Sequence, residues 1–274
     1  MTVRMSTSMA TLLVLTLLPV GAQTDARGGA RDVVKKWQAA IVNVRVVLKT
    51  RTSMAGRELQ SSDDTVEGIG TVIDPSGLVV MSLGVLNPGG MMTKLMGAVG
   101  SGGGDQKMEF TSEPTDLKVR LPDGREIPAK IVLRDEDLDL AFLRPAAAPD
   151  KPLVAVNLAE AATPALLDQV VVLSRLGRVG GWAPGAALHD IGAIIERPRT
   201  FFVLATPATT IGVPAFTPGG RIIGLLTVRQ IDAGRPGMMS MMGGTESLGL
   251  LPVILPAADV LEISKQARYC HWKW

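Results

Sequence analysis

The chain has 274 residues, of which 46% are hydrophobic and 20% charged, which fits one large or two small globular domains and excludes a disordered chain. Lys and Arg (28) nearly balance Asp and Glu (26), and without a dense basic run we expect no nucleic-acid partner. One cysteine, Cys270, excludes an internal disulfide, and with only two histidines we expect neither a metal site nor a cofactor.

Residues 1–22 have the layout of a secretory signal. Arg4 is followed by an apolar run, Met9–Leu18, and by the small residues Val20-Gly21-Ala22 before a polar segment. The run is shorter than the roughly 18 residues of a membrane span, so a retained anchor is the weaker alternative. We expect an exported protein, periplasmic or extracellular, with no membrane span once the signal is removed.

The sequence after the signal predicts six short strands, preceded by a helical pattern over 31–40. Two turn sequences, Asp-Pro-Ser-Gly at 74–77 and Pro-Asp-Gly at 122–124, predict hairpins because proline presets φ and glycine accepts positive φ. The strands are expected at 41–48, 69–73, 78–81, 117–121, 127–133 and 138–143.

A proline-rich stretch at 145–152 resembles a linker, and a second set of six strands follows it. These strands are expected at 169–173, 191–196, 201–205, 213–216, 221–228 and 248–255. We therefore predict an all-β fold of two six-stranded antiparallel β-barrels, at 34–145 and 155–266. A short C-terminal helix at 259–266 and a tail at 267–274 complete the prediction.

Two segments rich in glycine and methionine interrupt the strands, at 87–114 and 237–244. Long loops of this kind are either functional or simply mobile. The second segment contains Met238, Met239, Met241 and Met242, whose thioethers suit a soft ion such as Cu(I). Methionine is also a flexible apolar filler, and this interpretation is favoured because no histidine or cysteine accompanies the cluster.

Four motifs, in this order along the chain, resemble bacterial HtrA/DegP-type serine proteases. Residues 68–86, GIGTVIDPSGLVVMSLGVL, resemble the stretch that leads to the catalytic histidine, and 137–143, DLDLAFL, the stretch with the catalytic aspartate. Gly212-Val-Pro214 followed by 219–224 resembles the nucleophile segment, and 248–256 is similar to the domain ending. The resemblance covers 34–266 and implies a trypsin-like fold and serine-type endopeptidase activity. No PDZ-like segment is expected after Gln266.

The sequence departs from this family at the catalytic positions. Gly84 stands where the general base is expected and Ile211 where the nucleophile is expected, so only Asp139 matches. In such a triad the aspartate orients the imidazole and performs no chemistry alone. Thr209 replaces the permissive glycine of the oxyanion turn, so we do not expect preorganised backbone donors. No catalytic residue is therefore expected.

Three functions from different classes follow. We favour a secreted non-catalytic homologue that binds a peptide or protein partner in the former cleft. The first alternative is an active HtrA-type endopeptidase with displaced groups, such as Thr209 or Thr210 as nucleophile and His189, expected at a strand start, as base. The second alternative is a Cu(I) binder. The peptide-binding candidates are Thr209, Thr210, Ile211, Gly212, Met238 and Met239.

Overall fold

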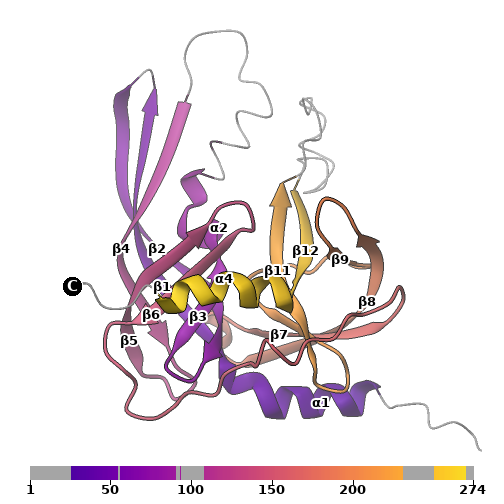
Figure 1. Cartoon of the computed structure of the whole chain (residues 1–274). Coiled ribbons are helices and arrows are strands. Elements are labelled where there is room, and N and C mark those ends of the chain that lie inside the picture. The colour runs from indigo at the N-terminus through magenta and orange to yellow at the C-terminus, as the bar shows by residue number, and fades with distance from the viewer. Residues whose placement is uncertain (1–25, 55, 91–92, 94–107, 231–249, 270–274) are drawn as a thin grey trace, which may run out of the picture.

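The computed structural model describes residues 26–54, 56–90, 93, 108–230 and 250–269. Two β-barrels lie side by side, with helix α1 beneath them and helix α4 packed across them (Figure 1). The predicted signal at 1–22 and the methionine segment at 237–244 lie outside the described residues. Within the described part of the chain, no helix is both long and apolar enough to cross a membrane.

The twelve predicted strands are confirmed, six in each barrel. The first barrel closes in the order β1-β2-β3-β6-β5-β4 and the second in the order β10-β11-β12-β9-β8-β7, with every neighbouring pair antiparallel. The first barrel contains β1 Ile41–Met54, β2 Arg57–Asp74, β3 Leu78–Ser82, β4 Met108–Arg120, β5 Glu126–Asp135 and β6 Leu140–Pro145. The second contains β7 Gln169–Arg175, β8 Pro184–Ile195, β9 Phe201–Leu204, β10 Pro214–Phe216, β11 Ile222–Gln230 and β12 Leu250–Pro256.

Helices occupy the ends of the described chain and one corner of the first barrel. The helices described over their whole length are α1 Ala26–Trp37, α2 Leu83–Leu86 and α4 Ala257–Tyr269, with short 3₁₀ turns at Gln38–Ala40 and Arg178–Gly180. Trp37 of α1 stacks on Phe216 of β10 with ring centroids 5.9 Å apart, so this helix is fixed to the second barrel although it leads into the first. Helix α4 continues through Tyr269, beyond the predicted end at Gln266.

One hydrophobic cluster joins the two barrels. It fills the first barrel with side chains such as Val44, Leu78 and Phe142, and continues over outward-facing residues of the second barrel such as Leu173 and Leu225. A smaller cluster fills the second barrel. The inter-barrel segment follows this shared surface, since Val156 N–H donates to Val72 O in the first barrel and Ala162 N–H donates to Ile222 O in the second. The barrels are therefore packed against each other through a largely apolar interface.

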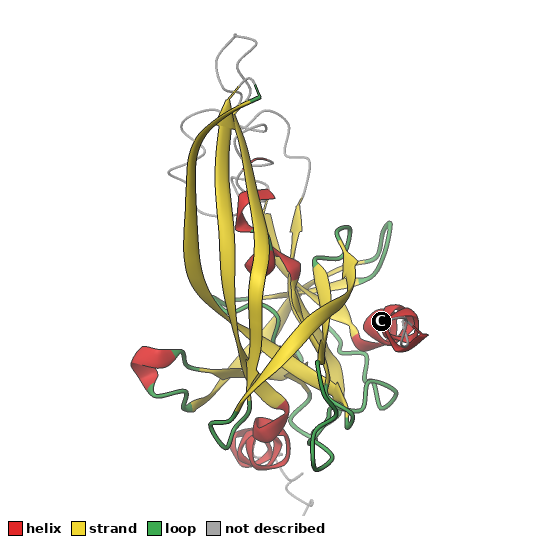
Figure 2. Ribbon diagram, turned by 90° about the vertical axis from the view of Figure 1, so that its left-hand side faces the viewer, coloured by secondary structure: helices red, strands yellow, loops and turns green. Residues whose placement is uncertain are grey.

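Strands β1, β2 and β4 are longer than predicted and form a three-stranded ribbon that rises beyond the first barrel (Figure 2). The prediction of a loop over the whole of 87–114 is wrong for 108–114, because these residues pair with Leu48–Met54. Residues 111–113 are all polar and no side chain over 109–114 is buried, since the ribbon encloses no core there. The strands predicted from the sequence therefore end where the buried side chains end.

Candidate active site

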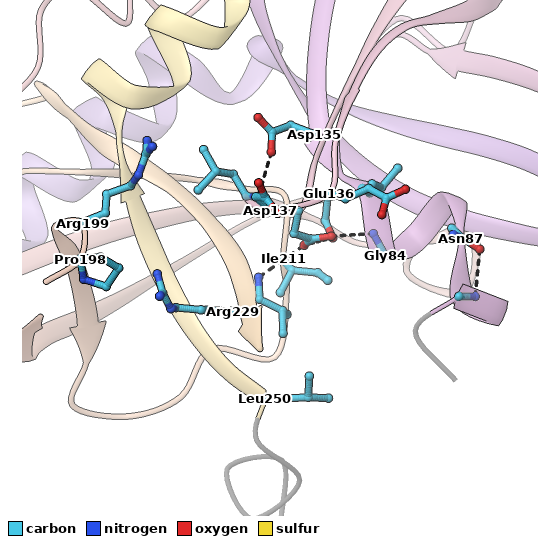
Figure 3. A pocket seen from close by; sticks show the side chains of 16 residues that line it. Gly84, Asn87, Asp135, Glu136, Asp137, Pro198, Arg199, Ile211, Arg229 and Leu250 are labelled. Carbon is cyan, nitrogen blue, oxygen red and sulfur yellow. Dashed lines mark hydrogen bonds between the residues drawn. The ribbon is translucent and has the colours of Figure 1, made fainter. Parts of the chain in front are cut away.

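A cavity of about 660 Å³ opens where the two barrels meet. Its walls come from the end of β3 and α2, from the turn between β5 and β6, from the loops before β9 and β10, and from β11 and β12 (Figure 3). The lining residues are Ser82, Leu83, Gly84, Asn87, Gly90, Asp135, Glu136, Asp137, Leu138, Asp139, Pro198, Arg199, Ile211, Val228, Arg229 and Leu250.

The three positions that the sequence assigned to a catalytic triad all line this cavity. Gly84 lies in α2, Asp139 lies in the turn immediately before β6, and Ile211 lies in the loop that leads to β10. Residues from both barrels thus converge as in an active site, but glycine offers no proton acceptor and isoleucine no nucleophilic atom. The cavity therefore brings together the three positions that the resemblance assigns to a triad.

Asp139 is held in place by donors from both barrels. One carboxylate oxygen, Oδ2, accepts hydrogen bonds from Ser82 Oγ at 2.5 Å and from Val228 N at 3.4 Å, and the other, Oδ1, accepts one from Gly84 N at 2.7 Å. Its backbone has φ of 55°, an uncommon value for a residue with a side chain. The carboxylate therefore fixes the arrangement of β3, α2 and β11 around the cavity.

Burial raises the pKa of Asp139, and the hydrogen bonds from Ser82, Gly84 and Val228 oppose that rise. Ser82 was not singled out in the sequence, although it lies only two residues before Gly84 in the same motif. Its side chain is fully buried and its hydroxyl donates to Asp139, the carboxylate that the resemblance would pair with an imidazole. No histidine lies on the described lining of the cavity, so the carboxylate of Asp139 is the group that faces this hydroxyl.

The loop at 209–212 is fixed between the barrels by its glycine. Gly212 has φ of 76°, its N–H donates to Leu226 O at 2.7 Å, and its carbonyl accepts from Thr71 Oγ1 at 3.4 Å. A Cβ at this position would lie 2.8 Å from Ile69 O and 2.9 Å from Ser82 N, so no larger residue fits. Only glycine therefore lets the loop approach the first barrel this closely.

Of the predicted peptide-binding residues that the structure describes, only Ile211 lines the cavity. Outside the lining, Thr209 is exposed, Thr210 is partly buried, and Gly212 is buried. Thr209 is not among the described residues with a positive φ. Its backbone therefore differs from that of a turn in which glycine is required at this position. Met238 and Met239 lie outside the described residues, and the Cu(I) hypothesis stays a prediction.

Charged residues around the cavity were not identified from the sequence. Arg199 and Arg229 lie on the side of the second barrel, and Asp135, Glu136 and Asp137 lie in the turn of the first barrel. Their signal in the sequence is weak, because an acidic run in a turn is usually just a solvated surface. Only the packing of the barrels places these two groups on opposite walls.

The remaining residues proposed for chemistry lie elsewhere. His189 is in the middle of β8, paired with Val170, rather than at a strand start as predicted, and it does not line the cavity. Within the described ranges, no three His, Cys, Asp or Glu side chains lie close enough together to hold a metal ion.

A family model described as the trypsin-like peptidase domain matches residues 68–225, which is more than half of the chain. The matched range contains Gly84, Asp139 and Ile211, and it crosses from the first barrel into the second. No curated protein matches the chain.

Proposed function

The chain belongs to the trypsin-like peptidase domain family, and on this premise we propose that it is a non-catalytic member that binds an extended peptide or a segment of a partner protein in its former active-site cleft. One observation carries the proposal: Gly84, Asp139 and Ile211 line a single cavity, and two of the three lack the reactive group that their position requires. The finer resemblance to HtrA-type proteases is part of the proposal.

The atoms at the cavity support the proposed absence of catalysis. A serine hydroxyl attacks a peptide only when a base removes its proton, and here both groups are replaced by residues that cannot do so. The hydroxyl on the described lining, Ser82 Oγ, is buried and donates to Asp139. His189 lies on β8, away from the lining, so it does not act as a relocated base.

Peptide binding is supported by the volume of the cleft and by the edge of strand β11. A volume of about 660 Å³ lies within the usual range of roughly 300–1,000 Å³ for ligand sites. Strand β11 pairs with β10 as far as Leu225, and Leu226 bonds to Gly212 and Val213 in the loop before β10. Beyond Leu226, Val228 and Arg229 have a described strand neighbour on the β12 side alone, although the N–H of Val228 already donates to Asp139. An extended peptide can add to such an edge through main-chain hydrogen bonds.

Ile211 adds apolar surface at the centre of the cleft. It lies between the two barrels beside Val228 and Leu250, so an apolar side chain of a ligand would be covered from several directions. Covering one such side chain contributes roughly 1–2 kcal/mol to binding. The substitution that removes the nucleophile therefore favours retention of a ligand.

The first experiment tests the absence of catalysis. The purified protein is incubated with an unfolded protein substrate and with a serine-directed fluorophosphonate, and we expect no cleavage and no label. Stoichiometric labelling that disappears in Thr209→Ala or Thr210→Ala would refute the proposal in favour of a protease with displaced groups.

The second experiment tests binding. The wild type is applied to an array of extended apolar peptides, and bound peptides are then titrated against Ile211→Asp, which buries an unpaired charge in the cleft. The control is Thr209→Asp, which adds the same charge two residues away at an exposed position outside the lining. We expect loss of binding for the first variant only. The proposal is wrong if no peptide binds or if Ile211→Asp binds unchanged.

Export is a separate part of the proposal, based on the signal-like pattern of residues 1–22. Cleavage after Ala22 would leave a chain that starts at Gln23. N-terminal sequencing of the protein recovered outside the cytoplasm tests this directly, and an intact Met1 would contradict it.

A further inference from the structure

The two walls of the cleft carry opposite charges that do not neutralise each other. Arg229 lies on the wall formed by the second barrel and Glu136 on the wall formed by the first, with Ile211 between them (Figure 3). Arg199 also lies on the second wall, but its guanidinium pairs with Asp259 of α4 at 3.2 Å. Of the two arginines that line the cavity, Arg229 is thus the one that no described carboxylate pairs with.

Arg229 is held in a defined position without being neutralised. Its guanidinium lies over the ring of Phe201, with Cζ 4.6 Å from the ring centroid, and Phe201 is itself buried. Its described contacts include no hydrogen bond and no ion pair. A stacked guanidinium still presents its N–H donors at the edge of its plane, where a carboxylate can accept two of them. This geometry suits an anionic group of a ligand.

The opposite wall carries acidic side chains. Asp135 Oδ1 accepts the backbone N–H of Leu138 at 3.0 Å, which closes the turn between β5 and β6. The turn presents Glu136 and Asp137, both exposed, and neither forms an ion pair or hydrogen bond with a described residue. We call Glu136 and Asp137 the acidic turn. Because Asp135 carries the structural role, the acidic turn is left for a ligand.

The lining also contains the apolar side chains of Ile211, Val228 and Leu250, of which Ile211 lies between these charges (Figure 3). We propose, building on the peptide-binding function above, that the cleft selects an extended peptide segment with an apolar residue flanked by an acidic and a basic residue. The carboxylate pairs with Arg229, the apolar side chain covers Ile211, and the cation meets the acidic turn. Charge complementarity of this kind fixes the direction of the bound segment as well as its identity.

Arg229 is tested by a double-mutant cycle on the tightest peptide from the array. Fluorescence anisotropy compares the peptide with its acidic residue as Glu or as Gln, against wild type and Arg229→Gln. We expect the Glu-to-Gln change to weaken wild-type binding about tenfold, as for hydrogen bonds between charged groups, and to have almost no effect on the variant. Arg178→Gln, an exposed arginine outside the lining, should behave as wild type.

The acidic turn is tested in the same way, with the basic residue of the peptide as Lys or as Gln. The variant is Glu136→Gln with Asp137→Asn, and the control is Glu58→Gln with Asp63→Asn, two exposed acids on β2 outside the cavity lining. Wild type and control should bind the Lys peptide about threefold to fivefold more tightly than the Gln peptide, and this preference should vanish in the variant. The preference should also weaken as salt is raised from about 0.05 to about 0.5 M.

The outcomes separate this inference from the function on which it rests. If peptides bind without preference for an acidic residue, or if the cycle at Arg229 is additive, the charge selection is refuted while peptide binding stands. If no peptide binds, both fail. Peptides with an amidated C-terminus distinguish a side-chain carboxylate from a chain-terminal one, and dependence on Arg229 supports the inference in either case.

Discussion

Arg175 joins the two barrels through a buried guanidinium, and its removal should be costly. The side chain comes from β7 in the second barrel and is only 9% exposed. Its three nitrogens donate to Ile41 O at 2.8 Å in β1, to Gln38 O at 2.8 Å in the 3₁₀ turn, and to Trp182 O at 2.9 Å. No ion pair with a described carboxylate accompanies these bonds, so the guanidinium is compensated by carbonyl oxygens alone.

The cost of Arg175→Met follows from these contacts. The variant leaves up to three carbonyl oxygens without a donor, at about 1–3 kcal/mol for each one that water does not reach. It also relieves the desolvation of the guanidinium, which burial disfavours. We therefore expect the free energy of unfolding to fall by about 3–5 kcal/mol. Arg175→Lys keeps the charge but reaches fewer carbonyls, so about half of that loss should remain.

Urea denaturation followed by circular dichroism measures both changes at pH 7. Arg178→Met is the matched control, because this arginine is three residues further along the chain, exposed, and without a side-chain hydrogen bond. It should change the free energy of unfolding by less than about 0.5 kcal/mol. A loss below about 1 kcal/mol for Arg175→Met would refute the inference that the guanidinium holds the barrels together.

Gly212→Ala should lower the free energy of unfolding by about 3 kcal/mol or more, because the strain of a positive φ and the overlap of the new Cβ with backbone atoms both destabilise the fold. The control Gly219→Ala should be nearly neutral. Equal urea midpoints for the two variants would contradict this. Because burial raises the pKa of Asp139 above its ordinary value of 3.8, the folded protein holds that proton more tightly than the unfolded chain. Relative to Asp139→Asn, the wild type should therefore gain stability as the pH falls through the raised pKa toward 3.8; a difference that does not vary with pH would show that Asp139 titrates normally. Ser82→Ala should cost about 1.5–3 kcal/mol in urea unfolding at pH 7 by removing a hydrogen bond to the carboxylate, and an unchanged midpoint would show that this bond contributes nothing.

The parts of the fold that the sequence predicted are those fixed by local chemistry. At the turn 74–77, Asp74 Oδ1 accepts from both the N–H and the hydroxyl of Ser76, and Gly77 has φ of 94°. Each of these features depends on residues within the turn, so the sequence predicts it directly. The apolar runs of the barrel strands were equally visible, because each strand has buried side chains that recur along it.

The parts that escaped prediction depend on tertiary contacts. The hydrogen bond between Ser82 and Asp139 joins residues 57 positions apart, and nothing in either segment indicates it. The opposing charges of Arg229 and the acidic turn come together only through the packing of the barrels. The outer halves of β1 and β2 are polar on both faces, so periodicity gave no sign that they continue as strands.

The ribbon formed by the ends of β1, β2 and β4 has its own mechanical character. Beyond Leu48 of β1, none of the ribbon side chains that the structure describes is buried, and cross-strand pairs such as Arg51 and Glu113, 3.8 Å apart, are half exposed. Backbone hydrogen bonds therefore hold it together with little help from apolar burial, and its opening does not require the barrels to open. It is a region that can exchange its amide protons, accept an inserted tag or be cut by a protease near its tip while the cleft below stays intact.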